Sequence, residues 1–124
     1  MPEFTNPFSG NVPANKLTTE ELIRAIRLDV AAEQEAIHLY MAHAEATDNP
    51  LVKKVLIDIA NEERVHIGEF ERLLQILTGD EDDYIAEGKA EVDEMYIELT
   101  NSQQAEKENH SENTENITIG SLRS

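Results

Sequence analysis

Apolar residues recur at helical spacing along two long stretches of the chain. In residues 50–77 seven of them lie within roughly 40° of one direction when the chain is wound at about 100° per residue, and in residues 19–46 four lie within about 60°. The first stripe contains Val52, Leu56, Ile59, Ile67, Phe70, Leu74 and Leu77, and the second contains Ile26, Val30, Ile37 and Tyr40. The pattern predicts two long amphipathic helices.

Both stretches are delimited by residues that favour helix ends. Thr18 can accept a hydrogen bond from the N–H of Glu21 while Glu21 reaches back to Thr18, which is a capping box. Asn49 is a favoured N-cap, Pro50 suits the first helical position, and Gly79 suits the left-handed residue that ends many helices. We therefore expect helices over residues 19–46 and 50–77, joined by a short turn into an antiparallel hairpin.

The rest of the chain is less apolar. The acids at positions 80–83 suit a helix N-terminus, and the intermittent stripe behind them predicts a shorter third helix over residues 81–99. Residues 1–16 are predicted to be a disordered arm and the polar residues 101–116 a disordered linker. The stripe consists of Ile85, Val92, Met95, Tyr96 and Leu99. The predicted fold class is all-α, with residues 17–100 as the helical domain.

The last eight residues, 117–124, differ in side-chain pattern from the polar segment before them. They alternate apolar and small side chains, as in a docking peptide that lays Ile117, Ile119 and Leu122 into a groove while Gly120 allows a tight bend. Composition alone favours a frayed tail over such a peptide.

Composition and charge narrow the classes of function. The chain has no cysteine, no apolar run of membrane-spanning length and no charged start of a signal peptide, so we expect a cytoplasmic protein without disulfides. A net charge of −16 argues against a nucleic-acid partner. Residues 79–100 hold nine acids against Lys89 alone, a charge that serves solubility or gathers metal cations.

Each predicted hairpin helix carries an acid in the middle of its apolar stripe, Glu33 in the first and Glu63 in the second. Glu33 lies 15 residues before Asp48 and Glu63 lies 15 residues after it, so the two carboxylates should face each other across the hairpin. Burying an unpaired carboxylate costs several kcal/mol or more. The two acids therefore need a common positive partner.

His66 adds a nitrogen ligand to this pair. Glu63 and His66 form a Glu-x-x-His motif, whose spacing places both side chains on one side of a helix. Dinuclear carboxylate sites in four-helix bundles use a Glu from each of two helices and a Glu-x-x-His from each of the other two. One chain supplies half of this set, so we expect two copies to close a four-helix bundle around a shared metal site. The alternative, a buried ion pair with a protonated His66, leaves two acids for one positive charge.

Other residues on these helices are weaker candidates. Glu35 and His38 repeat the spacing, but they lie about 160° and 140° from Glu33, on the face predicted to be solvated. Glu35 could still bind metal outside the main centre. Tyr40 can either support a ligating carboxylate by a hydrogen bond or pack in the core.

These residues match a known family. Both long helices resemble the encapsulated ferritins, a branch of the ferritin-like superfamily, in residues 32–40 (AEQEAIHLY), in the hairpin turn and in residues 62–66 (EERVH). Independently, residues 119–123 (IGSLR) are similar to the C-terminal peptides that target cargo to encapsulin shells.

The resemblance implies a ferroxidase that oxidises Fe²⁺ with dioxygen at a di-iron centre shared across a dimer interface. It implies Glu33, Glu63 and His66 as ligands of two irons per interface, with manganese or calcium as substitutes, and a metal-uptake site that keeps Glu35 but has Ala32 where another acid can occur. It also implies an annular decamer of such dimers and iron storage inside an encapsulin nanocompartment. The residues that would dock to the shell are Ile117, Ile119, Gly120, Ser121 and Leu122.

Two rival functions stay open. A rubrerythrin-like peroxidase would use a similar di-iron bundle, although the absence of cysteine excludes the cysteine-ligated iron common in those proteins. A non-catalytic acidic helical adaptor would keep the dimer and the tail without iron chemistry.

Overall fold

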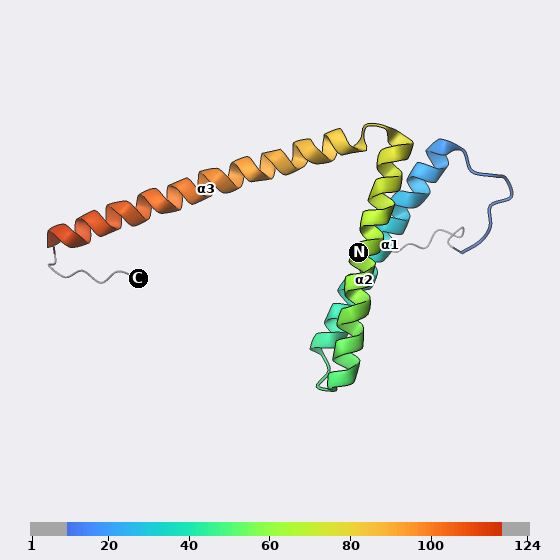
Figure 1. Ribbon diagram of the computed structural model, residues 1–124, viewed down its shortest axis with the longest axis horizontal. Helices are drawn as coiled ribbons and strands as arrows, with labels where there is room; N and C mark the ends of the chain where they lie inside the picture. Colours follow the sequence, from blue (N-terminus) through green and yellow to red (C-terminus); the bar gives the residue numbers. More distant parts are fainter. Residues whose placement is uncertain (1–9, 118–124) are drawn as a thin grey trace. The chain divides into compact units, whose positions relative to one another are not determined.

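The hairpin predicted from the sequence is present in the structure. A computed structural model describes residues 10–117, with side chains through residue 111, and in this part the chain is all-helical. The helices are α1 (Thr19–Glu45), α2 (Pro50–Thr78) and α3 (Glu81–Ile117). α1 and α2 pack along one another as an antiparallel pair (Figure 1). Both hairpin helices end within one residue of the predicted positions.

The predicted caps explain these helix ends. The N–H of Glu21 donates to Thr18 Oγ1 over 3.2 Å and the N–H of Thr18 donates to Glu21 Oε1 over 3.0 Å, which is the full capping box. The hydrogen bond from the Thr18 backbone lowers the pKa of Glu21. Asn49 Oδ1 accepts from the N–H groups of Leu51 and Val52, each over 3.1 Å. Gly79 ends α2 with a φ of 78°.

The hairpin by itself buries few side chains. Only Ala44, Ala60 and Leu74 are buried among the residues that the structure describes. Val52, from the predicted core stripe of α2, is still 43% exposed. The apolar face of a single hairpin is therefore incompletely covered.

The corner after α2 contains contacts that the sequence did not predict. Thr78 Oγ1 donates to the carbonyl of Leu74 over 2.7 Å and accepts from the N–H of Glu81 over 3.0 Å. The Arg27 guanidinium donates two hydrogen bonds to the Glu81 carboxylate, over 2.8 and 2.9 Å. This pair raises the pKa of Arg27 and lowers that of Glu81, mainly through the hydrogen bonds themselves. The first residue of α3 is thus fixed to α1.

The third helix differs from its prediction. α3 has 37 residues and is the longest helix, whereas we predicted a shorter helix ending near residue 99 and a disordered linker over 101–116. Those boundaries are wrong because polar residues have no apolar surface to bury against a neighbour but can still form the backbone hydrogen bonds of a helix. No Gly or Pro occurs between residues 89 and 117, and Gln, Glu, Lys and Ala are good helix formers.

Several predicted features lie outside the described residues. These are positions 1–9 of the predicted arm and the docking residues Ile119, Gly120, Ser121 and Leu122. Ile117 is the last residue of α3, and its side chain is outside the description as well. No helix in the described part of the chain combines the length and apolar character required to span a membrane.

Candidate metal centre

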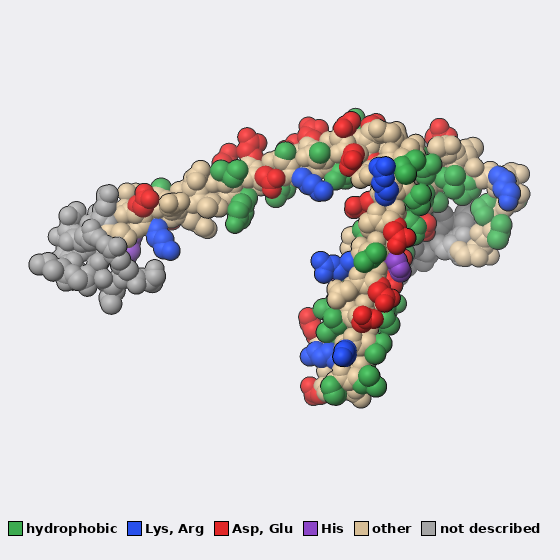
Figure 2. Space-filling model, viewed as in Figure 1, with side chains coloured by type: hydrophobic (Ala, Val, Ile, Leu, Met, Phe, Trp, Pro, Cys, Tyr) green, Lys and Arg blue, Asp and Glu red, His purple; other side chains and the backbone are tan. Residues whose placement is uncertain are grey.

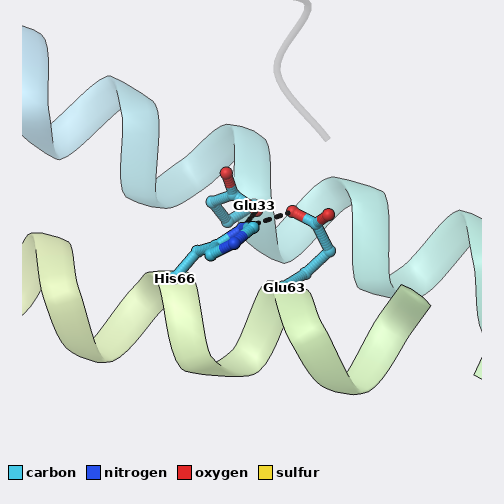
Figure 3. A group of neighbouring side chains, drawn as sticks. All are labelled: Glu33, Glu63 and His66. Atoms are coloured by element: carbon cyan, nitrogen blue, oxygen red, sulfur yellow. Dashed lines mark ion pairs between the residues drawn. The ribbon is translucent and has the colours of Figure 1, made fainter. Parts of the chain in front are cut away.

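The hairpin brings together the three residues that the sequence analysis selected as metal ligands. Glu33 projects from the middle of α1, and Glu63 and His66 project from the facing part of α2 (Figure 3). Their ligand atoms all lie within 4.8 Å of one another. This convergence follows from the register predicted from the turn, because Glu33 and Glu63 lie at equal distances in sequence from Asp48.

The contacts inside the cluster are longer than normal hydrogen bonds. His66 Nδ1 lies 3.5 Å from Glu63 Oε2 and 3.7 Å from Glu33 Oε2, against about 2.7–3.2 Å for an N–H···O bond. One imidazole nitrogen therefore faces two carboxylate oxygens without bonding tightly to either. The spacing leaves room for a cation between the three side chains.

Burial makes this arrangement costly without a cation. The Glu33 and Glu63 side chains are only 20% and 18% exposed, while His66 is 47% exposed. Glu33 Oε2 is buried and has no hydrogen-bond partner. A buried acceptor without a partner costs about 1–3 kcal/mol, and more when it is charged. A bound cation would remove that cost.

The donor set fits a divalent transition metal. Carboxylate oxygens favour hard cations, and imidazole suits iron, zinc and copper, so two carboxylates and one imidazole fit Fe²⁺ and also Mn²⁺. Three side chains leave coordination positions open for a further ligand or a second metal. This fit rests on the orphaned oxygen of Glu33 and on the identity of the donors.

The other candidate residues do not join the cluster. Glu35 is partly buried on α1 and lies outside the group of three, so its role in metal uptake stays a prediction. Tyr40 is also partly buried, and no hydrogen bond joins it to Glu33 or Glu63 in the described part of the chain. Its supporting role likewise stays a prediction. Residues 10–111 hold no second cluster of three such ligands.

Comparison with known proteins places the chain in a family. The family profile described as Rubrerythrin matches residues 17–119. The crystal structure of an encapsulated ferritin domain from Pyrococcus furiosus superposes with a TM-score of 0.65 at 38% sequence identity, covering 72% of this chain and 90% of that one.

Two curated relatives agree with this match. The chain is 49% identical over 74 residues, 60% of its length, to the encapsulin nanocompartment cargo protein EncC of Myxococcus xanthus, and covers 55% of that protein. It is 40% identical over 78 residues, 63% of its length, to a ferritin-like–encapsulin shell fusion protein of P. furiosus, and covers 23% of that one. The chain thus spans about half or less of the length of these relatives. The chain belongs to the rubrerythrin family and, within it, to the encapsulated ferritins.

Proposed function

We propose that two copies of the chain share a di-iron centre at their interface and oxidise Fe²⁺ to Fe³⁺ with dioxygen. The observation that carries this proposal is the cluster of Glu33, Glu63 and His66, in which a buried carboxylate oxygen lacks a partner. Two such clusters would supply four carboxylates and two imidazoles, the complement of a dinuclear site in a four-helix bundle.

The exposed apolar face of the hairpin supports the shared site. Val52 and Val55 of α2 are 43% and 47% exposed, and Leu73 is 44% exposed. On the helix they lie within about 80° of Glu63, on the same side as His66. A second hairpin laid on this side would bury these residues and bring a second set of ligands to the first. We therefore propose a dimer as the functional unit and an annular decamer of dimers as the larger assembly.

The chemistry follows from the charges of the ligands. Iron is the substrate: each of two Fe²⁺ ions gives up one electron, and dioxygen accepts both electrons together with two protons from the solvent, which gives hydrogen peroxide. Carboxylates stabilise the higher charge of Fe³⁺ as it forms, while the imidazole of His66 also binds Fe²⁺ well, so the mixed set holds both oxidation states. Half-exposed His66 lies on the solvent side of the cluster, where metal can arrive. Glu35 is the proposed ligand of a separate uptake site.

The test is aerobic Fe²⁺ oxidation by the purified chain, with bound iron counted per chain. We expect rapid oxidation with about one site iron per chain, lost in Glu33→Gln, Glu63→Gln and His66→Ala. The matched control is His38→Ala, which removes the histidine of the other Glu-x-x-His motif and should keep the wild-type rate. Oxidation no faster than in buffer for the wild-type chain would refute the ferroxidase.

We further propose that the chain is cargo of an encapsulin shell in the cytoplasm, docked through Ile117, Ile119, Gly120, Ser121 and Leu122. The similarity to an encapsulin cargo protein of M. xanthus supports this partner. An isolated ring does not enclose a volume for mineral, so oxidation would occur at this chain and storage in the shell. Deletion of residues 117–124 should abolish co-purification with the shell while leaving the oxidation rate unchanged, and retained loading would contradict the docking role.

A rubrerythrin-like peroxidase is the second candidate, favoured by the family profile itself. Without cysteine the chain would need a separate electron donor. Peroxide consumption supported by a reductant, faster than dioxygen-dependent Fe²⁺ oxidation, would favour this activity. If Glu63→Ala leaves dimers and shell binding intact and the wild-type chain has neither activity, the metal-free adaptor is the better account.

A further inference from the structure

One side of α2 differs in charge from the rest of this acidic chain. The sequence has 26 acids against ten basic residues, and α2 carries four of the ten. When the helix is wound at about 100° per residue, three of these four fall within about 40° of Gly68, and no acid of α2 falls in that range. Lys and Arg side chains follow one edge of the hairpin in Figure 2. The three basic residues are Lys54, Arg64 and Arg72.

Two of these residues flank Gly68 at equal spacing. Arg64 lies four residues before Gly68 and Arg72 lies four residues after it. Residues four apart on a helix are neighbours on its surface, with Cβ atoms about 5–6 Å apart, so both guanidinium groups can reach the space above Gly68. That space is open at the position where a Cβ would lie. α2 thus places two positive charges around an empty position on its surface.

A side-chain amide holds each arginine in the metal-free hairpin. Arg64 Nη1 donates to Asn61 Oδ1 over 3.5 Å, and Arg72 Nη1 donates to Gln75 Oε1 over 3.2 Å. Both acceptors are neutral, and both distances are at or beyond the upper end of the usual range for an N–H···O bond. A guanidinium group has five N–H donors, so each arginine keeps donors for a charged acceptor. We call Asn61, Arg64, Gly68, Arg72 and Gln75 the Gly68 surface.

The chain does not neutralise the charges of the Gly68 surface. Among residues 10–111, no ion pair involves Arg64 or Arg72. Both arginines are exposed. Glu71 and Glu69 lie about 60° and 100° from Gly68, one to each side, so they confine the positive charge to a narrow part of the helix. The two arginines are therefore available to an anion from outside the chain.

Geometry and charge select the class of anion. Guanidinium groups bind carboxylate and phosphate oxygens through two parallel hydrogen bonds. A carboxylate has one charge and two oxygens, which one arginine satisfies, whereas a phosphate group carries up to two charges and at least three acceptor oxygens. A phosphate group can therefore bond to both arginines at once. One open position fits a single such group, and a net charge of −16 repels a long polyanion such as nucleic acid.

We propose that the Gly68 surface binds one phosphate group between Arg64 and Arg72. On binding, each guanidinium exchanges its neutral amide acceptor for phosphate oxygens. Gly68 lies about 140° around α2 from Glu63, so the bound group does not touch the metal ligands. This site goes beyond the proposed ferroxidase and does not depend on metal.

The test is calorimetric titration of the full chain with inorganic phosphate, in excess chelator and at constant ionic strength. We expect saturable binding of about one phosphate per chain, weakened by added salt. Arg64→Gln/Arg72→Gln should raise the dissociation constant at least about tenfold, because it removes both charge-assisted contacts.

Two further variants separate the site from the general charge of the helix. Lys53→Gln/Lys54→Gln removes the same two charges from α2 about 21 Å or more from Gly68 along the axis, and should keep the dissociation constant within about twofold of wild type. Gly68→Gln fills the open position with a better helix former, so circular dichroism should stay helical while phosphate binding is lost.

A parallel titration with adenosine monophosphate distinguishes the source of the phosphate group. Equal or tighter binding of this ester would identify a phosphate ester as the ligand, and binding of inorganic phosphate alone would identify the free ion; either result supports the site.

Three results would overturn the proposal. An equal loss of binding in the lysine variant would mean a diffuse effect of charge. Acetate binding as tightly as phosphate would contradict the choice of anion. Absence of saturable binding by both phosphate compounds would remove the site altogether. Because every titration is metal-free, failure of the proposed ferroxidase would leave these results unchanged.

Discussion

Replacing Glu33 by leucine should make the metal-free protein more stable. Glu33 Oε2 is buried without a hydrogen-bond partner, and the side chain is only 20% exposed. An unsatisfied buried acceptor costs about 1–3 kcal/mol, and the remaining exposure places this site in the lower part of that range. We expect Glu33→Leu to raise the free energy of unfolding of the apo protein by about 1–2 kcal/mol. The stability of Glu33→Gln should lie between those of the wild type and Glu33→Leu.

The effect is large enough to measure. For a domain of 60–100 residues, 1 kcal/mol corresponds to about 4–8 °C in Tm, so Glu33→Leu should melt at least about 4 °C above wild type in excess chelator. Adding Mn²⁺ in place of the chelator should make the wild-type chain the more stable of the two, because a ligand that binds only the folded state stabilises it by RT ln(1 + [L]/Kd). Only the wild-type chain would gain stability from the metal.

The controls exclude two trivial explanations. Glu35→Leu makes the same chemical change on the same helix outside the cluster, and should stay within about 0.5 kcal/mol of wild type. Leucine in the proposed dimer face would also strengthen association, so all chains are compared at concentrations where their masses agree. A Glu33→Leu protein no more stable than wild type without metal would refute the reasoning that this carboxylate is held at a cost.

Three further predictions concern the ends of the helices and the metal. Asn49→Ala removes the acceptor of two backbone N–H groups and should lower the free energy of unfolding by about 1 kcal/mol, as measured by urea denaturation. Glu81→Gln should cost about 0.2–1 kcal/mol at pH 7, because Arg27 is 49% exposed. Since Arg27 lowers the pKa of Glu81, this contribution is present above the unfolded pKa of about 4.3 and is lost as the pH falls through the folded value, so melts of the two proteins should converge in acid. Chelation should increase dimer dissociation, and an unchanged mass would contradict a shared site.

The sequence predicted the hairpin and its cluster because the signals are local or follow from simple geometry. The capping box of Thr18 and Glu21 and the Asn49 cap each depend on residues within three positions of one another. The meeting of Glu33 with Glu63 needed only helical periodicity and one short turn. Such features do not depend on the conformation of the rest of the chain.

The wrong or missing predictions concern features that the periodicity of apolar residues does not describe. α3 continues past residue 99 because its polar residues are good helix formers, whereas the prediction ended the helix where apolar residues ended. The pair of Arg27 and Glu81 joins residues 54 positions apart through the geometry of one corner. Neither residue lies in a motif, so no pattern in the sequence indicated the contact.

Metal binding and assembly are coupled in the proposed centre because one chain holds only half of the ligands. If a site forms only in the dimer, every metal concentration above its Kd lowers the free energy of the dimer and not that of the monomer. At a free metal concentration 100 times Kd this amounts to about 2.7 kcal/mol, which lowers the apparent dimer dissociation constant about 100-fold. In the proposed dimer, the unpaired oxygen of Glu33 and the exposed side chains of Val52 and Leu73 would have one common cause, which is that a second copy completes the hairpin.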